Sequence, residues 1–280
     1  MIKFRFLMVI LAAFLLPVTG AAFTPSSEPI LRLNTEMHFA SVQNVSSDQY
    51  GRFVLSCSTD KTAKLWDADN GNLLKTFRVP AEKGNNGKLY ACAISPQGRA
   101  IVLGGWTGRS GQDKFIYVFN TNTGEMTQRL PDIPNVVNGL KFYNEDIFAA
   151  ALGGSNGVRV FKRSGRLFSL HRKLDECNGK TSNIAFNKDG WLAAASYDGY
   201  IRLYNSKFNM VAQEKTTNGS RPFGVSFNAD GSKLAISDRY SDKLEVRDGR
   251  NLKFLFYPDY KGVDERRNLM FSLAYSPDGY

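Results

Sequence analysis

Cysteine and histidine are scarce in this chain of 280 residues, and their scarcity excludes several kinds of site. The three cysteines, Cys57, Cys92 and Cys177, are odd in number and form no C-x-x-C motif, which argues against a disulfide framework and a zinc site. The two histidines, His38 and His171, are too few for a site built from several histidines. We therefore predict no metal and no cofactor. Cys57 and Cys92 lie in apolar runs typical of a core, whereas Cys177, in a polar stretch, is expected to be accessible.

Long apolar runs are absent except for one near the N-terminus, residues 6–16. Its 11 residues fall short of the ~20 that a membrane-spanning helix requires. Lys3 and Arg5 precede the run, and a proline and small residues follow it, the order typical of a cleavable signal peptide. We therefore predict that residues 1–22 are a signal peptide and that the mature protein is exported, periplasmic or secreted, with no transmembrane segment. An uncleaved anchor is the alternative.

Blocks of basic residues are also missing, although the formal net charge is +10. Because acidic residues are interspersed among the lysines and arginines, we predict a solvated basic surface and no nucleic-acid partner. Helical periodicity is absent after the N-terminus, while Phe (20) and Tyr (12) are plentiful. This combination favours an all-β fold.

A short turn recurs along the chain ahead of a β-rich run, and its glycines lie about 40 to 50 residues apart, or twice that where one degenerate unit intervenes. These glycines are Gly51, Gly98, Gly190, Gly231 and Gly279. Such a period, with four short strands (a to d) per unit, predicts β-propeller blades. The predicted complete blades are residues 38–79, 88–130, 135–171, 180–215 and 221–257, and a partial sixth begins near Leu269.

The first unit carries the most specific pattern. Two strand-like runs, residues 53–58 and 63–67, flank a polar turn, and the second run closes on Trp-Asp. With His38 about 20 residues upstream, this unit resembles the WD40 repeat, a family of β-propellers. The resemblance implies a buried hydrogen-bonded tetrad of His38, Ser56, Asp60 and Trp66, with Ser58 as the alternative to Ser56. In later units the Trp-Asp pair is lost, and the fourth keeps only the turn aspartate, Asp198.

Residues 84–108 begin GNNGKLYACAISPQGR and end GGWTG. They resemble the WD40 region of secreted bacterial proteins that carry a caspase-like, peptidase C14-type domain on the same polypeptide. The resemblance implies a regulatory or substrate-docking role beside such a domain. Because no cysteine here has a nucleophile context, we predict that the chain itself is not an enzyme. An enzyme propeller of the lactonase or glycosidase type is a further alternative, which inward-pointing carboxylates at matching positions would favour.

Two glycine-rich stretches, Gly104-Gly105 and residues 153–157, invite comparison with phosphate-binding loops. Neither precedes a predicted helix or a Gly-Lys-Ser or Gly-Lys-Thr sequence, both of which a phosphate-binding loop needs. We therefore predict that both are hairpin turns.

Aromatic residues and arginines gather on the loops from strand d to strand a and from strand b to strand c, which share one face of a propeller. These residue types anchor protein interfaces. We predict a non-catalytic scaffold that binds a protein or peptide on this face. The predicted face residues are Lys88, Trp106, Arg109, Tyr197, Arg221, Arg239 and Tyr240.

A linker with an isolated strand, Ile30–Leu33, occupies residues 23–37. WD40 propellers commonly close by using such a strand as the outer strand of the last blade. Residues 38–280 otherwise supply five complete blades and one strand of a sixth. We therefore predict a six- or seven-bladed ring that is incomplete at the C-terminus, with open sheet edges through which chains could self-associate.

Overall fold

The computed structural model describes residues 36–109, 112, 114–217, 221–241, 244–259 and 272–276. Regular structure in these residues consists of twenty β-strands, so none of them belongs to a helix that could span a membrane. The predicted signal peptide and the strand Ile30–Leu33 lie outside the described residues, as do residues 269–271 of the predicted sixth blade.

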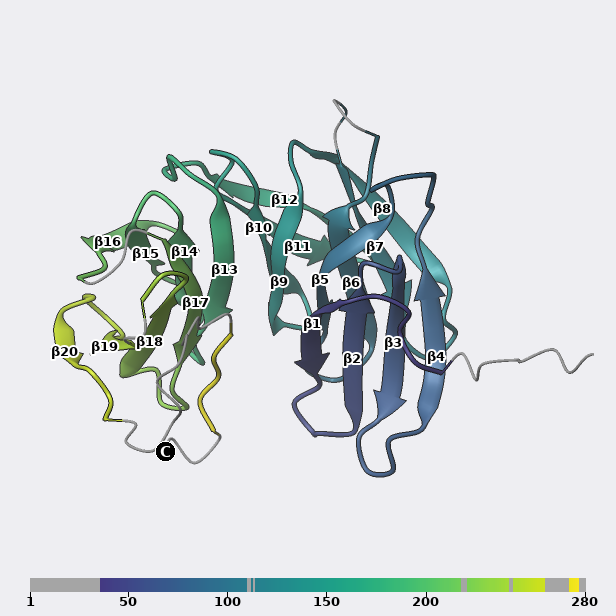
Figure 1. Cartoon of the computed structure of the whole chain (residues 1–280), viewed down its shortest axis with the longest axis horizontal. Coiled ribbons are helices and arrows are strands. Elements are labelled where there is room, and N and C mark those ends of the chain that lie inside the picture. The colour runs from purple at the N-terminus through teal and green to yellow at the C-terminus, as the bar shows by residue number, and fades with distance from the viewer. Residues whose placement is uncertain are drawn as a thin grey trace, which may run out of the picture. The chain divides into compact units, whose positions relative to one another are not determined.

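The strands form five four-stranded antiparallel sheets that follow one another along the chain, as Figure 1 shows. Each sheet covers one stretch predicted as a complete blade. Blade one contains β1 (Val42–Ser47), β2 (Phe53–Ser58), β3 (Thr62–Asp67) and β4 (Leu73–Arg78). Blade two contains β5 (Lys88–Ile94), β6 (Ala100–Trp106), β7 (Lys114–Asn120) and β8 (Met126–Ile133).

The other three sheets repeat the same order. Blade three contains β9 (Val137–Asn144), β10 (Ile147–Leu152), β11 (Val158–Ser164) and β12 (Leu167–Leu174). Blade four contains β13 (Thr181–Phe186), β14 (Leu192–Ser196), β15 (Tyr200–Tyr204) and β16 (Met210–Lys215). Blade five contains β17 (Pro222–Phe227), β18 (Lys233–Asp238), β19 (Glu245–Asp248) and β20 (Phe254–Phe256). The predicted all-β fold is confirmed.

The recurrent turn joins the first two strands of a blade. Four of its glycines have positive φ, at 66° for Gly51, 69° for Gly98, 79° for Gly190 and 76° for Gly231. Residues with a Cβ rarely adopt this conformation, which explains why the turn is marked by glycine. In blade one the Asp48 side chain also accepts hydrogen bonds from the backbone N–H groups of Arg52 and Phe53, which closes the turn.

The apolar core is divided into four layers, each between two consecutive sheets. Leu55 and Leu65 of blade one pack with Leu103 of blade two, for example, and Ile201 of blade four packs with Ile236 of blade five. Both faces of a middle blade are therefore buried, while the outermost strands β16 and β20 are largely exposed. This explains why the strands b and c read as continuous apolar runs.

The first strands of the blades, β1, β5, β9, β13 and β17, are neighbours in that order. Residues 272–276 lie beside β17, with the Tyr275 N–H 3.4 Å from Ser226 Oγ. These five residues form no assigned strand, unlike the strand predicted for this part of the sixth blade. The inner strands and residues 272–274 together line an open cavity of about 910 Å³.

One of the two glycine-rich stretches was predicted wrongly. Gly104 and Gly105 lie within β6, at a bulge opposite Leu89, and not in a hairpin turn. A Cβ at Gly105 would lie 2.3 Å from the Lys88 carbonyl oxygen, so the close approach of two backbones requires glycine here. The second stretch does connect β10 to β11, as predicted.

Candidate functional site

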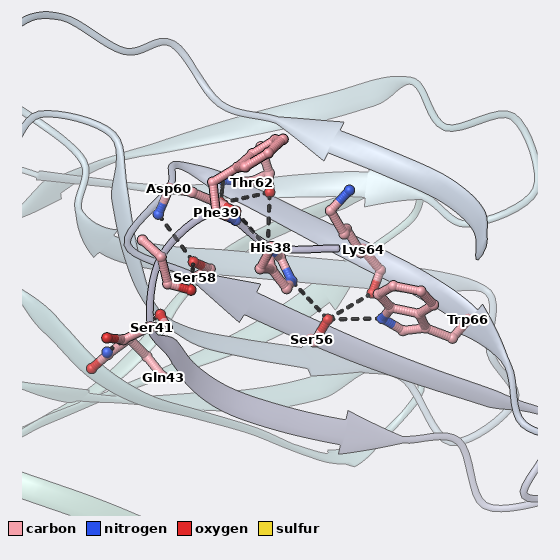
Figure 2. Close-up of polar contacts among 11 residues, drawn as sticks. His38, Phe39, Ser41, Gln43, Ser56, Ser58, Asp60, Thr62, Lys64 and Trp66 are labelled. Atoms are coloured by element: carbon pink, nitrogen blue, oxygen red, sulfur yellow. Dashed lines mark hydrogen bonds and ion pairs between the residues drawn. The ribbon is translucent and has the colours of Figure 1, made fainter. Parts of the chain in front are cut away.

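Blade one contains a chain of hydrogen bonds that links the segment before β1 to β2 and β3 (Figure 2). His38 Nδ1 lies 2.8 Å from Asp60 Oδ2, and because a carboxylate can only accept, Nδ1 carries the proton. His38 Nε2 lies 2.8 Å from Ser56 Oγ, and Trp66 Nε1–H donates to the same oxygen at 2.8 Å. Ser58 instead donates to the Ala40 carbonyl, so the geometry selects Ser56.

Asp60 is the most connected member of this set. Its carboxylate also accepts hydrogen bonds from the backbone N–H of Phe39 at 3.0 Å and from Thr62 Oγ1 at 2.6 Å. Burial raises the pKa of the Asp60 carboxyl, but the hydrogen bonds from Thr62, His38 and Phe39 outweigh burial and hold the pKa below its usual value. The four residues of the tetrad do not line the central cavity, and their mutual bonding indicates a structural role.

Blades four and five each contain a buried ion pair. In blade four, Arg202 Nη2 donates to Asp198 Oδ2 at 2.7 Å, with only 2% of the arginine side chain and 9% of the aspartate side chain exposed. Burial raises the pKa of Asp198, whereas Arg202 and two backbone N–H groups lower it to a net value below the usual one. In blade five, Arg247 and Glu245 form a pair at 2.7 Å.

In blade three the buried Arg159 places its Nη1 2.5 Å from Asp175, but 54% of the aspartate side chain is exposed. None of these pairs was predicted from the sequence. The sequence does contain a sign of them, because an arginine occurs among the alternating core residues in the third strand of blades three, four and five. The acidic partner comes from a different place in each blade, which hid the pattern.

Cys177 contradicts its prediction, since only 1% of its surface is exposed. It lies in the same part of blade four as Asp198 and Arg202, and burial raises the pKa of its thiol. Cys57 and Cys92 are core residues, as predicted. All three described cysteines are free thiols.

The predicted face residues of blades four and five come together in one cluster, the blade-four/five patch of Tyr197, Arg221, Arg239 and Tyr240. Arg239 Nη1 donates to the Tyr197 hydroxyl at 3.0 Å, and Arg221 Nη1 donates to the Tyr240 hydroxyl at 3.2 Å. The Arg221 guanidinium also lies 5.2 Å from the centre of the Tyr240 ring. Guanidinium groups and aromatic rings thus alternate across the patch.

The predicted face residues of blade two form a second cluster. Lys88 pairs with Trp106 across β5 and β6, and the Trp106 ring lies 5.2 Å from Lys114 Nζ. Arg109 is exposed and forms a bidentate ion pair with Glu82, with Nη2 to Oε1 at 2.8 Å. The Arg109 charge is therefore already compensated within the chain.

Both clusters lie at the same ends of the blades. In each sheet the start of the first strand pairs with the end of the second, as with Lys88 and Trp106 in blade two and with Pro222 and Asp238 in blade five. Trp106 also lines the central cavity, as do Lys180 and Phe223 beside the blade-four/five patch. The mouth of the cavity therefore joins the two clusters.

The WD40 family, described as WD domain, G-beta repeat, matches residues 29–67. The fold is that of a WD40-type β-propeller. The chain is 25% identical over 170 residues to the periodic tryptophan protein 2 homolog of Schizosaccharomyces pombe, covering 57% of this chain and 18% of that protein. It is 23% identical over 152 residues to protein HIR1 of Candida albicans, covering 50% of this chain and 15% of that protein. The chain thus spans less than a fifth of the length of these curated relatives.

Groups suited to metal binding do not gather in the described residues. No three His, Cys, Asp or Glu side chains there are placed to share a metal ion. The described lining of the central cavity contains neither aspartate nor glutamate, so the inward-pointing carboxylates expected of an enzyme propeller are not found in that lining.

Proposed function

We propose that this chain is an exported, extracytoplasmic scaffold that binds a protein or peptide partner on the face formed by its d–a and b–c loops. The observation that carries the proposal is the blade-four/five patch. It presents Tyr240, with 60% of its surface exposed, between two arginines. Exposed tyrosine and arginine side chains held by mutual contacts lose little entropy on binding, which makes them good interface anchors.

The charge of the patch favours an acidic partner segment. Arg221 forms no ion pair with another described residue, and its guanidinium lies against the Tyr197 and Tyr240 side chains. Lys180 lies 5.3 Å from the Tyr197 ring and likewise has no acidic partner among the described residues. Carboxylates of a partner could therefore pair with these cations without displacing an existing ion pair.

A photo-crosslinking residue placed at position 240 tests this face, and Tyr50 supplies the matched control. Tyr50 is 61% exposed and lies 4.9 Å from the Arg52 guanidinium, but it belongs to the turn between β1 and β2, at the other end of its blade. We expect covalent adducts with a partner from position 240 and none from position 50. Equal crosslinking from both positions, or none from 240, would place the binding surface elsewhere.

The Tyr240→Ala variant gives the second arm of this experiment. It should weaken capture of the crosslinked partner by about tenfold or more, the effect typical of an interface anchor, while thermal unfolding stays nearly unchanged. Trp106→Ala tests the blade-two cluster in the same way. If neither variant changes capture, the face proposal is wrong.

Export is part of the proposal and rests on residues 1–22. Lys3, Arg5 and the apolar run support it. Intact-mass analysis of the protein recovered from its host should find a new N-terminus near Phe23. A full-length cytosolic product would contradict export.

A regulatory or substrate-docking role beside a caspase-like domain is the second candidate. The resemblance of residues 84–108 favours it, and Lys88 and Trp106 of the blade-two cluster lie within that stretch. Under this proposal the crosslink from position 240 would reach a protease domain or its substrate, which peptide sequencing of the adduct would identify.

A further inference from the structure

The charged residues described in the lining of the central cavity are all positive. It holds about 910 Å³ and is bounded by the inner strands of all five blades and by residues 272–274. Two lysines, Lys141 of β9 and Lys180 ahead of β13, contribute to the wall, and no aspartate or glutamate does in the described residues. A cavity of this size lies within the range of small-molecule sites.

Lys141 is the more enclosed of the two cations. It is part-buried in β9, and it forms no ion pair with any described residue. Burial lowers the pKa of its ammonium group, because the charged form has lost water and gained no carboxylate. Burial and the nearby charge of Arg239 lower the pKa of Lys180 as well. Two under-compensated cations therefore face one polar space.

The neighbouring side chains add hydrogen-bond donors. Asn183 Oδ1 accepts the backbone N–H of Ile184 at 2.8 Å, which leaves its amide N–H groups as the free end. Asn135 is held in the same way by the N–H of Val136 at 2.8 Å. Asn138 donates to the Thr181 carbonyl at 3.0 Å and so stiffens the wall between β9 and β13. Asn183 therefore offers amide donors from a fixed strand, β13, and preorganised donors of this kind suit a bound anion.

We propose that this cavity binds a small polar molecule with a phosphate or carboxylate group. Lys141 neutralises the anionic group, the Asn183 amide donates a hydrogen bond to it, and Lys180 lies beside the path from the loop face. Lysine provides a point charge in place of the planar fork of arginine, and it therefore serves phosphate and carboxylate alike. This inference is independent of the partner on the loop face.

Lysine acetylation with mass-spectrometric readout tests the proposal on the intact protein. The probes are inorganic phosphate and citrate, each compared with sodium chloride at the same ionic strength. At a probe concentration about ten times its Kd, occupancy should slow acetylation of Lys141 about tenfold. Lys207, an exposed lysine outside the cavity, should react at an unchanged rate. The stronger of the two probes identifies the anionic group.

The Lys141→Met variant separates binding from folding. It should lower the affinity for the effective probe by more than about tenfold, measured by calorimetry, as expected when a buried ion-pairing charge is removed. Its thermal midpoint should stay equal or rise, because an unpaired charge leaves the cavity. Lys207→Met should bind as the unchanged protein does.

Three results would overturn the proposal. The first is no protection of Lys141 by phosphate or citrate, and the second is equal protection by sodium chloride. The third is protection by an acidic peptide alone, which would assign the cavity to a side chain of the macromolecular partner.

Discussion

Replacing Asp60 by alanine removes the acceptor on which the polar set of blade one depends. His38 Nδ1–H at 2.8 Å, Thr62 Oγ1–H at 2.6 Å and the Phe39 N–H at 3.0 Å all lose their partner. The side chains of His38 and Asp60 are only 5% and 7% exposed, so water has little access to donors that lose the carboxylate. The change therefore tests whether the geometry of Figure 2 stabilises the blade.

The size of the effect follows from these contacts. A buried donor without a partner costs about 1–3 kcal/mol. The Phe39 N–H is exposed and can bond to water, and Thr62 Oγ1, 3.2 Å from His38 Nδ1, can accept the histidine proton in place of the carboxylate. Two donors of Thr62 then lack the carboxylate, namely its Oγ1–H and its backbone N–H, which lies 2.9 Å from Asp60 Oδ1. We therefore expect Asp60→Ala to cost about 2–3 kcal/mol of unfolding free energy.

Chemical denaturation of the Asp60→Ala and Asp69→Ala variants provides the assay. Asp69 is exposed in the turn between β3 and β4, and its replacement should change the unfolding free energy by less than about 0.5 kcal/mol. Asp60→Asn, which keeps one acceptor oxygen, should fall between them. Equal midpoints for Asp60→Ala and Asp69→Ala would refute the reasoning.

Three further predictions concern the later blades. Gly157→Ala should destabilise far more than Gly165→Ala in thermal melts: both residues have positive φ (58° and 61°), but a Cβ at Gly157 would lie 1.8 Å from the Leu174 carbonyl oxygen, whereas the space at Gly165 is open. Arg202→Met should cost about 3 kcal/mol or more in denaturant melts by leaving Asp198 unpaired, and adding Asp198→Asn should recover part of the loss. The pKa of Asp198 is lower in the folded state than in the unfolded state. Its contribution to the unfolding free energy is therefore complete above about pH 4 and is lost as the pH falls through the folded pKa. Asp198→Asn should flatten the acid limb of a curve of stability against pH.

The fold was accessible from the sequence because its signals are local. The glycine of the recurrent turn needs positive φ, and it therefore marks the same point of blades one, two, four and five, as at Gly98 and Gly231. Alternating polar turns and apolar runs then fix the four strands of a blade. His38, Ser56, Asp60 and Trp66 occur at the spacing of the WD40 repeat, whereas the bonds from Thr62 and Phe39 to Asp60 have no counterpart in that pattern.

Local signals failed where the backbones of two segments meet. Gly104-Gly105 has the composition of a turn, yet it lies in β6 because the chain of β5 passes too close for a Cβ. Cys177 has polar neighbours in the sequence, yet it is buried beside the blade-four ion pair, while Asp175 pairs with Arg159 of blade three. Such contacts between distant segments cannot be read from composition.

The ion pairs show that the buried polar residues of a blade can differ while its four-stranded sheet stays the same. An arginine in the third strand is long enough to reach an acceptor in several directions. Arg202 meets Asp198 in the turn before its own strand, whereas Arg159 meets Asp175 in the segment after the fourth strand. Arg247 meets Glu245 two residues away on the same strand. In each blade the arginine side chain is buried, while its acidic partner comes from a different segment. A sequence pattern that requires His, Ser, Asp and Trp at fixed spacing therefore detects blade one and misses the blades in which an arginine ion pair is found instead.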